Sequence, residues 1–383
     1  KDISLAESNT IGRTPHETII EFIVKELQEI VPDLPKREEL ATADNGKITK
    51  AAALMLMARV YLYESNWAKT EYYCNEIMSG KYGKYELFPS YTGLFEIKNE
   101  YNSEVILDYA YVPSIRTWGE LWDMVPLSKG GRLINTAPTQ SLVDNYIMLD
   151  GKSIDQSSNY DPAHPYDKRD PRLTATVIYD NYKWSENVND GSVNEVIYTN
   201  PSNNTPDAYK GINANSSATG YYIRKYYDPH HEAQLALSTN IITMRYADVL
   251  LMYAEAMNEQ NKMSEDVWNA TIRPIRVRAG FTDAQALNYP SGLSNKEMQK
   301  LLRVERRSEL ALEGLRWFDI KRWKAGSEYL NGVVRGARFA PNNNYIQLDN
   351  YKFIESRDYL WSVPQSQIDI NANLKPNNPG YAN

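Results

Sequence analysis

The sequence predicts a mainly α-helical fold, in which a tetratricopeptide-like repeat scaffold carries a long irregular insertion. Apolar residues recur at helical spacing near both ends of the chain, at about 14–80 and 239–330. Between them, at about 81–238, this periodicity fades and Asn, Asp, Gly and Pro become frequent. A tail at about 340–383 is expected to be extended, and residues 1–383 are expected to form one domain.

The first helix is expected to begin in the segment Thr14-Pro15-His16-Glu17. A capping Thr, a Pro at the first helical position and a Glu that bonds back to the cap together make a capping box. An apolar stripe then follows at helical spacing, and prolines end the helix: Ile19, Ile20, Ile23, Leu27, Ile30, Pro32 and Pro35.

Two more helices are expected at 51–64 and at 67–77, separated by a short break. Small residues at Ala51 and Ala58 would let neighbouring backbones approach closely. Two helices joined by a tight turn are typical of a tetratricopeptide unit.

The helical pattern returns at 245–258, and its partner lies around Trp268. Another helix is expected to begin at Ser294, where Glu297 completes a second capping box. Arg and Glu then alternate, a pattern expected of either a solvated helix face or buried pairs between helices: Arg303, Glu305, Arg306, Arg307, Glu309 and Glu313. Three aromatic residues that continue this helical stripe are expected in the core: Trp317, Phe318 and Trp323.

The middle region is expected to hold short strands at 105–107 and 176–179 among its loops. A loop-rich insertion packed on a rigid scaffold is where recognition residues tend to be displayed. The unusual aromatic content, 29 Tyr and 8 Trp against 7 Phe, favours wet surfaces that stack flat ligands.

Composition excludes several classes of function. A net charge of −7 offers no basic field for nucleic acid, and the apolar run 51–58 is too short to span a bilayer. The single Cys74 can form neither an internal disulfide nor a metal cluster, and we expect it to be buried. The four histidines lack metal-ligand spacing and no catalytic motif is present, so we expect no metal, no cofactor and no enzyme.

A Pro- and Asn-punctuated tail, YLWSVPQSQIDINANLKPNNPGY at 359–381, ends the chain. It resembles the C-terminal signature of the SusD/RagB family of Bacteroidetes nutrient-binding lipoproteins. Trp361 within it is expected to pack against the scaffold. Five further segments resemble the same family in the same order: 46–67, 102–107, 135–173, 245–258 and 301–323.

The resemblance implies a non-catalytic, cell-surface lipoprotein of the outer membrane. Such proteins bind oligosaccharides and deliver them to a SusC-like TonB-dependent transporter, although some members carry peptide instead. Members begin with a lipidated cysteine followed by the first repeat helices. The resemblance therefore implies that the N-terminal part, with the lipid anchor and part of the ligand site, is missing from this chain.

The first candidates for glycan contact are Trp118 and Trp122, which follow Tyr109 and Tyr111 in the insertion. Sugar rings pack their C–H faces on indole and phenol rings, and a neighbouring Arg116 can meet hydroxyl groups. The alternative is a short amphipathic helix whose two tryptophans, four residues apart, both face the core.

A second candidate pair is Tyr182 and Trp184, in a loop-like stretch rich in Asn. An alternative function stays open as well. In it the chain is a peptide-binding or protein-interaction scaffold of helical repeats, and all these aromatic residues are structural.

Overall fold

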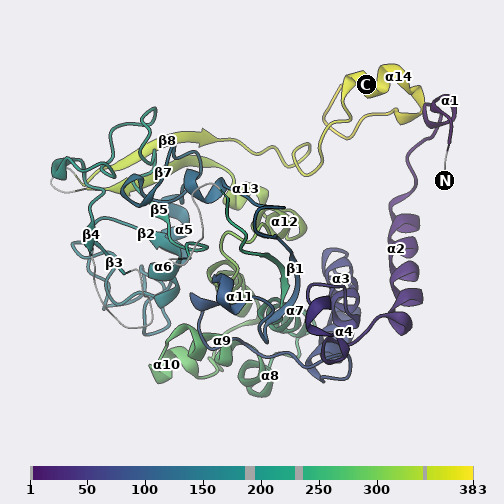
Figure 1. The fold of residues 1–383 in the computed structure, drawn as a ribbon, viewed down its shortest axis with the longest axis horizontal. Coiled ribbons are helices and arrows are strands. Elements are labelled where there is room, and N and C mark those ends of the chain that lie inside the picture. The colour runs from purple at the N-terminus through teal and green to yellow at the C-terminus, as the bar shows by residue number, and fades with distance from the viewer. Residues whose placement is uncertain (1–2, 186–194, 229–235, 340–342, 383) are drawn as a thin grey trace.

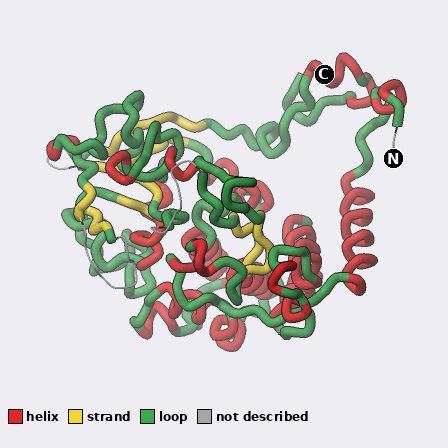
Figure 2. Tube along the Cα trace, in the orientation of Figure 1, coloured by secondary structure: helices red, strands yellow, loops and turns green. Residues whose placement is uncertain are grey.

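The structure, a computed structural model, describes residues 3–185, 195–228, 236–339 and 343–382. Helices and loops make up most of it, and the strands are short (Figure 2). The predicted mainly α-helical class with a loop-rich middle is confirmed. None of the helices in these ranges is both long and apolar enough to cross a membrane.

The helices differ in length, and the longer ones build the scaffold. The longer helices are α2 (His16–Ile30), α3 (Lys50–Tyr63), α4 (Trp67–Met78), α7 (Tyr246–Glu259), α9 (Ile272–Ala279) and α11 (Asn295–Glu309). The shorter helices are α1 (Leu5–Ser8), α5 (Gln140–Asn145), α6 (Pro171–Thr176), α8 (Glu265–Ala270), α10 (Ala284–Leu287), α12 (Arg316–Arg322), α13 (Gly326–Tyr329) and α14 (Gln365–Ile370).

The strands form antiparallel pairs. The pairs are β1 (Val105–Tyr109) with β6 (Ile241–Arg245), β2 (Val177–Ile178) with β5 (Tyr222–Ile223), β3 (Tyr182–Trp184) with β4 (Glu195–Ile197), and β7 (Gly332–Arg338) with β8 (Tyr345–Tyr351). The strands expected at 105–107 and 176–179 are confirmed as β1 and β2. The pair β1–β6 joins the start of the insertion to the strand that leads into α7.

Helices α3, α4 and α7 share one apolar core. Thr49 and Asn66 begin α3 and α4 by accepting a hydrogen bond from the backbone N–H three residues on. Ala51 and Ala58 are fully buried, and α3 is apolar on nearly every side because neighbours surround it. Cys74 lies in the same core, as expected.

One of the two predicted capping boxes is formed. Ser294 and Glu297 exchange hydrogen bonds with each other's backbone N–H at the start of α11. The box expected at Thr14 is wrong, because Pro15 occupies the N-cap position and gives α2 no side-chain cap. Thr14 lies one residue outside the helix.

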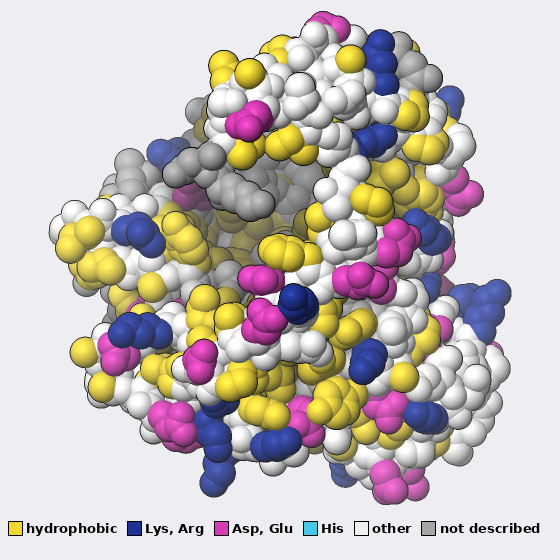
Figure 3. Space-filling model, turned by 90° about the vertical axis from the view of Figure 1, so that its right-hand side faces the viewer, with side chains coloured by type: hydrophobic (Ala, Val, Ile, Leu, Met, Phe, Trp, Pro, Cys, Tyr) yellow, Lys and Arg dark blue, Asp and Glu magenta, His cyan; other side chains and the backbone are white. Residues whose placement is uncertain are grey.

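Helix α2 lies at the side of the molecule (Figure 1), and much of its apolar surface is exposed. Val24 is its buried residue, whereas Ile19, Phe22 and Ile30 are 41%, 58% and 43% exposed. Figure 3 shows the face of the molecule on this side, where hydrophobic side chains are frequent and the surface is hollowed. The apolar stripe predicted for this helix is therefore only partly buried against the rest of the described chain.

The tail is not extended throughout, which corrects the expectation. Its first part, β8, forms a hairpin with β7, and a later part forms α14. The tail ends beside the N-terminal segment, where Asn371 Nδ2 donates to the Ile11 carbonyl (2.8 Å) and Asn373 Nδ2 to the Thr10 carbonyl (2.7 Å). Trp361, expected to pack against the scaffold, is 73% exposed.

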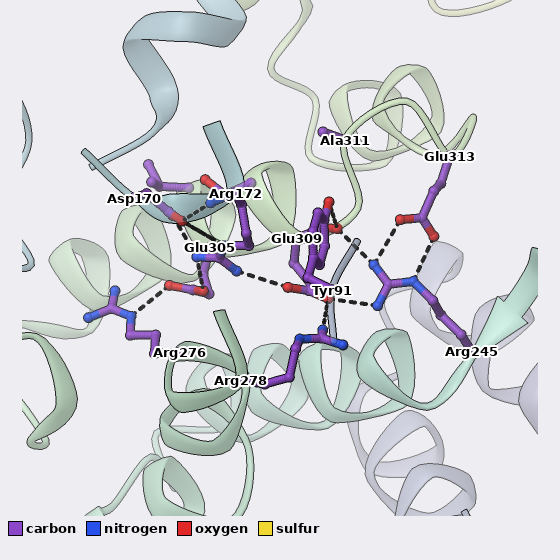
Figure 4. Close-up of polar contacts among 12 residues, drawn as sticks. Tyr91, Asp170, Arg172, Arg245, Arg276, Arg278, Glu305, Glu309, Ala311 and Glu313 are labelled. Atoms are coloured by element: carbon purple, nitrogen blue, oxygen red, sulfur yellow. Dashed lines mark hydrogen bonds and ion pairs between the residues drawn. The ribbon is translucent and has the colours of Figure 1, made fainter. Parts of the chain in front are cut away.

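Buried ion pairs between elements, one of the two arrangements that the pattern allows, form at Glu305, Arg306, Glu309 and Glu313. Arg303 and Arg307 are half-buried and form no ion pair with a described residue. Figure 4 shows Glu309, whose carboxylate accepts hydrogen bonds from Arg172 of α6, Arg245 of β6 and Arg278 of α9. Five cationic side chains and five carboxylates meet in this cluster, each at most 5% exposed: Lys225, Arg172, Arg245, Arg276, Arg278, Glu104, Asp170, Glu305, Glu309 and Glu313.

A second cluster of equal and opposite charges joins α3, α7, α11 and α12. Its members are Arg59, Arg306, Arg322, Asp248, Glu255 and Asp319. Burial alone would raise the pKa of Asp248, but Arg306 and Arg59 hold that pKa well below its usual value. These cations are thus neutralised pair by pair inside the protein.

Candidate functional site

Four of the predicted site residues, Tyr109, Tyr111, Arg116 and Trp118, lie together in an aromatic cluster at the surface. Tyr109 ends β1, and Tyr111 follows two residues later. The chain then turns back sharply, and two hydrogen bonds of 2.9 Å join the backbones of Val112 and Arg116. This turn places the Arg116 guanidinium over the Tyr109 ring, 5.3 Å from its centroid.

Segment 237–240 holds the aromatic cluster in place. The backbone N–H of Trp118 donates to the Leu237 carbonyl (3.0 Å), and the N–H of Leu237 donates back (2.8 Å). The indole Nε1 of Trp118 donates to the Thr239 carbonyl (2.9 Å), and the backbone N–H of Tyr111 donates to Asn240 Oδ1 (2.8 Å). These hydrogen bonds fix the positions of Tyr111 and Trp118.

The three rings are inclined to one another. The Tyr109 and Tyr111 centroids are 5.3 Å apart with planes at 63°, and those of Tyr111 and Trp118 are 6.3 Å apart with planes at 50°. Tyr109 is 51% exposed, whereas Tyr111 and Trp118 are partly exposed. A flat ligand cannot lie on all three ring faces at once, so this geometry favours a ligand that bends.

Trp122, the other first candidate, lies in the core, which corrects its prediction as a stacking platform. It is 1% exposed and packs with Leu121, Val125 and Leu237. The expected alternative, a helix with both tryptophans inward, is also not what forms. A 3₁₀ turn begins only at Glu120, so Trp118 lies outside it and keeps part of its surface open.

Tyr182 and Trp184 are buried too, at 5% and 0% exposure, so these two rings are likewise not accessible platforms. They alternate with the exposed Lys183 in β3, and both point to the same inner side because side chains alternate along a strand. The Trp184 ring has the Arg224 guanidinium 4.7 Å and the Lys129 ammonium 5.0 Å from its centroid. The stretch expected to be an exposed loop is a short inward-facing strand.

Two carboxylates support the aromatic cluster through Asn240. The Asn240 side-chain amide donates to Asp108 Oδ2 (2.9 Å), and its backbone N–H donates to Glu100 Oε1 (2.7 Å). Burial raises the pKa of Asp108, and burial together with the charges of Asp108 and Asp228 raises the pKa of Glu100 to about 7. Asn240, which accepts a hydrogen bond from the Tyr111 backbone, is thus itself held by Glu100, a carboxyl group that titrates near neutral pH.

A second aromatic surface was not predicted from the sequence. A cavity of about 500 Å³ is lined by Tyr166, Tyr179, Asn181, Arg338 and Phe339, among others. Tyr166 and Tyr179 are stacked, with centroids 3.9 Å apart and planes at 17°. The available signal was a Tyr at the end of the strand expected at 176–179, followed at once by Asp and Asn.

A third aromatic surface lies beside the tail. Phe318, expected in the core, is 51% exposed and stacks on Tyr63 with centroids 6.4 Å apart. Trp317 and Trp361 have centroids 6.4 Å apart and line a cavity of about 340 Å³. The prediction that Trp317, Phe318 and Trp323 lie in the core is therefore wrong, because Phe318 is exposed and the two tryptophans are only half-buried.

The arrangement of these surfaces suits non-covalent binding. Within the described ranges, no group of three or more His, Cys, Asp and Glu side chains is placed to hold a metal ion. His164 pairs with Asp161 at 2.9 Å on the surface, and this hydrogen bond raises the pKa of the imidazole. What remains in the aromatic cluster is a set of rings and one guanidinium.

The sequence signature of the SusD family matches residues 126–381. The chain belongs to the SusD family. SusD-like protein P2 of Formosa agariphila is 41% identical to this chain over 145 residues, which is 38% of this chain and 26% of that protein. SusD-like protein P25 of the same species is 26% identical over 343 residues, which is 83% of this chain and 58% of that protein. The matches thus cover less than two thirds of the length of either relative, 26% and 58%.

A solved structure shares the fold as well. The crystal structure of a SusD-like carbohydrate binding protein from Bacteroides fragilis superposes with a TM-score of 0.83 at 25% identity. The match covers 97% of this chain and 74% of that chain. The SusD/RagB resemblance that the tail and five other segments predicted is confirmed.

Proposed function

We propose that this SusD-family protein binds a glycan non-covalently on the aromatic cluster of Tyr109, Tyr111, Arg116 and Trp118. The observation that carries the proposal is that segment 237–240 fixes the cluster by four hydrogen bonds while its rings keep open surface. The similarity to a SusD-like carbohydrate binding protein supports it.

The chemistry of the cluster suits sugars. A pyranose ring packs its C–H groups on an aromatic face, and a guanidinium donates hydrogen bonds to hydroxyl oxygens. The inclined planes of Tyr109, Tyr111 and Trp118 favour a glycan that turns between successive units rather than one that lies flat.

The proposed setting is the outer cell surface. There the whole protein, held by a lipid anchor, would deliver captured oligosaccharide to a SusC-like TonB-dependent transporter. Membership in the SusD family supports this setting. The proposal includes no turnover, so incubation with polysaccharide should release no reducing ends.

The test is affinity electrophoresis of the protein through gels that contain one glycan each, followed by titration calorimetry. Tyr109→Ala and Arg116→Ala change exposed side chains, and Trp118→Phe keeps a ring but removes the indole N–H. We expect each to weaken binding by roughly tenfold, about 1.4 kcal/mol, with little change in melting temperature.

The matched control is Trp361→Ala, because Trp361 is an exposed tryptophan, 73% accessible, outside the aromatic cluster. It should leave glycan retardation unchanged. If Trp361→Ala abolished retardation and Tyr109→Ala did not, the binding surface would lie beside the tail and the proposed site would be wrong.

A protein or peptide ligand is the second candidate, and the open apolar surface of α2 favours it. Ile19, Phe22 and Ile30 on that helix are exposed, and such surfaces are typical of protein contacts. Titration with peptides beside the glycan panel separates the two functions. Binding of peptides together with silence toward every glycan would favour this second function.

A further inference from the structure

A cavity of about 440 Å³ lies between α5, α11, α12, α13 and the β7–β8 hairpin, and neither the family resemblance nor the aromatic cluster accounts for it. Its size falls within the range of small-molecule sites, about 300–1,000 Å³. Arginines and tyrosines stand out among the side chains that line it: Arg307, Arg316, Arg335, Tyr329, Tyr345 and Tyr351.

The arginines of this cavity differ from Arg306, the neighbour of Arg307 on α11. Arg306 pairs with Asp248 and Asp319, at 2.5 and 2.8 Å. Its neighbour Arg307 donates one hydrogen bond, to Ser141 Oγ at 3.0 Å. Across the described chain, no carboxylate lies within ion-pair distance of Arg307, Arg316 or Arg335.

The surroundings of Arg307 disfavour its positive charge, although the charge of Asp144 offsets part of this effect. Burial, with the nearby charge of Arg316, lowers the pKa of Arg307 to about 10. Burial also lowers the pKa of Arg316. Arg307 is half-buried, and a charge that has lost part of its hydration is stabilised by an opposite charge and hydrogen bonds. An anion that enters the cavity would supply that compensation.

Aromatic rings lie beside two of the guanidinium groups. Arg316 lies against two rings, 4.4 Å from the Tyr329 centroid and 5.6 Å from that of Trp323. Arg335 lies 5.6 Å from the Tyr345 ring centroid. A guanidinium group presents its N–H donors as a planar fork that matches a carboxylate or sulfate group.

Two acidic residues, Asp144 and Glu328, also line the cavity and distinguish its ligand from a simple anion. Asp144 Oδ1 accepts a hydrogen bond from Gln140 Nε2 at 2.7 Å, and burial raises its pKa. Carboxylates that face a ligand accept hydrogen bonds from hydroxyl groups, whereas they repel a free anion. The cavity thus combines guanidinium groups, carboxylates that can accept hydrogen bonds from hydroxyl groups, and tyrosine rings. Together these groups match a sugar that carries one negative charge.

We propose that this cavity binds an acidic sugar unit of a glycan, with Arg307 and Arg316 on its anionic group. The group is the carboxylate of a uronate or a sulfate ester, two sources of the same chemistry. The inference rests on the proposed glycan binding and narrows it to acidic glycans.

The experiment is titration calorimetry of the full 383-residue chain with four probes. They are trigalacturonate, its fully methyl-esterified form, a sulfated galactan trisaccharide and sodium sulfate alone. The ester keeps every ring and hydroxyl group but removes the charge. We expect trigalacturonate or the sulfated trisaccharide to bind at least tenfold more tightly than the ester, and this preference to weaken as NaCl is raised.

The variants are Arg307→Gln and Arg316→Gln, each expected to abolish the preference for the charged sugar. Arg307→Gln leaves no carboxylate unpaired, so its melting temperature should not fall. The matched control is Arg273→Gln, which removes one positive charge from α9, where Arg273 donates to Asn288 Oδ1 (3.1 Å) outside the cavity. It should keep the preference.

The outcomes separate the two proposals. Equal affinity for trigalacturonate, the sulfated trisaccharide and the ester, or equal effects of Arg307→Gln and Arg273→Gln, would overturn the acidic-sugar site while glycan binding stood. Arg307-dependent binding of sulfate without binding of any sugar would overturn the sugar assignment. Loss of all glycan binding in Tyr109→Ala, with the charge preference of the wild type dependent on Arg307, would support both proposals.

Discussion

Replacement of Glu309 by Gln tests whether the buried ion cluster of Figure 4 holds the insertion on the helical scaffold. Glu309 is fully buried. Its Oε1 accepts from Arg245 Nη1 (2.7 Å) and from Arg278, and its Oε2 accepts from Arg172 Nη1 (3.0 Å). The Gln side chain has the same shape but carries no charge and turns an N–H₂ group toward an arginine.

The magnitude follows from the charge balance. Five cations face five carboxylates, so Glu309→Gln leaves one buried positive charge without compensation. Loss of one partner of a buried pair costs about 3–5 kcal/mol. We expect about 3 kcal/mol, the lower end, because Arg172 and Arg245 each keep two other carboxylate partners.

The assay is urea unfolding followed by tryptophan fluorescence at pH 7, since guanidinium chloride would screen the charges. Burial alone would raise the pKa of Glu309, but Arg278, Arg245 and Arg172 hold it well below its usual value. Its contribution is therefore fully present above about pH 4.5 and is lost as the pH falls toward the folded-state pKa. The difference in unfolding free energy between wild type and Glu309→Gln should shrink in acid.

The matched control is Glu297→Gln, the same change on the solvent side of α11, where Gln can still complete the capping box. Glu297→Gln should leave the free energy of unfolding nearly unchanged, both at pH 7 and in acid. A loss below about 1 kcal/mol for Glu309→Gln at pH 7, or a difference that stays constant in acid, would refute the role of charge in this cluster.

Two further predictions concern the surroundings of the aromatic cluster. Trp122→Ala should destabilise the protein by about 3–5 kcal/mol in urea, because it empties a fully packed core site; a loss no larger than that of Tyr109→Ala would contradict its buried position. Glu100, with its pKa raised to about 7, binds a proton in the folded state that the unfolded chain has already lost above about pH 4.5. Stability should therefore fall by about 1 kcal/mol between pH 5 and 8, after discounting for the solvent that reaches this half-buried group, and Glu100→Gln should remove that fall; an unchanged slope in the variant would count against it.

Local signals predicted the elements that depend on local interactions. The capping box of Ser294 and Glu297 and the apolar spacing of α3 and α4 act within a few residues, so sequence is enough to place these helices. The box expected at Thr14 shows the limit of the same logic. A proline one residue on can occupy either the N-cap or the first helical position, and here Pro15 takes the cap.

Exposure of the aromatic residues was less predictable, because it depends on neighbours far along the chain. Trp118 keeps part of its surface open since its backbone is tied to Leu237, about 120 residues later in sequence, while Trp122 turns inward. The alternation of Tyr182 and Trp184 about one lysine was a readable strand signal. The Asn-rich residues on either side of this stretch are more typical of a loop, which is why a loop was expected.

Two adjacent arginines on α11 show why charge patterns cannot assign function without a structure. Arg306 and Arg307 have the same chemistry and share the same Arg/Glu pattern, yet successive residues point about 100° apart on a helix. Arg306 therefore meets Asp248 and Asp319 between α7 and α12, whereas Arg307 faces the cavity under the β7–β8 hairpin. A cation that is paired with carboxylates inside the protein has a structural task, whereas a half-buried cation without a carboxylate partner, at the wall of a cavity, is available to a ligand. That difference, invisible in the sequence, makes Arg307 rather than Arg306 the residue to test for binding of an acidic sugar.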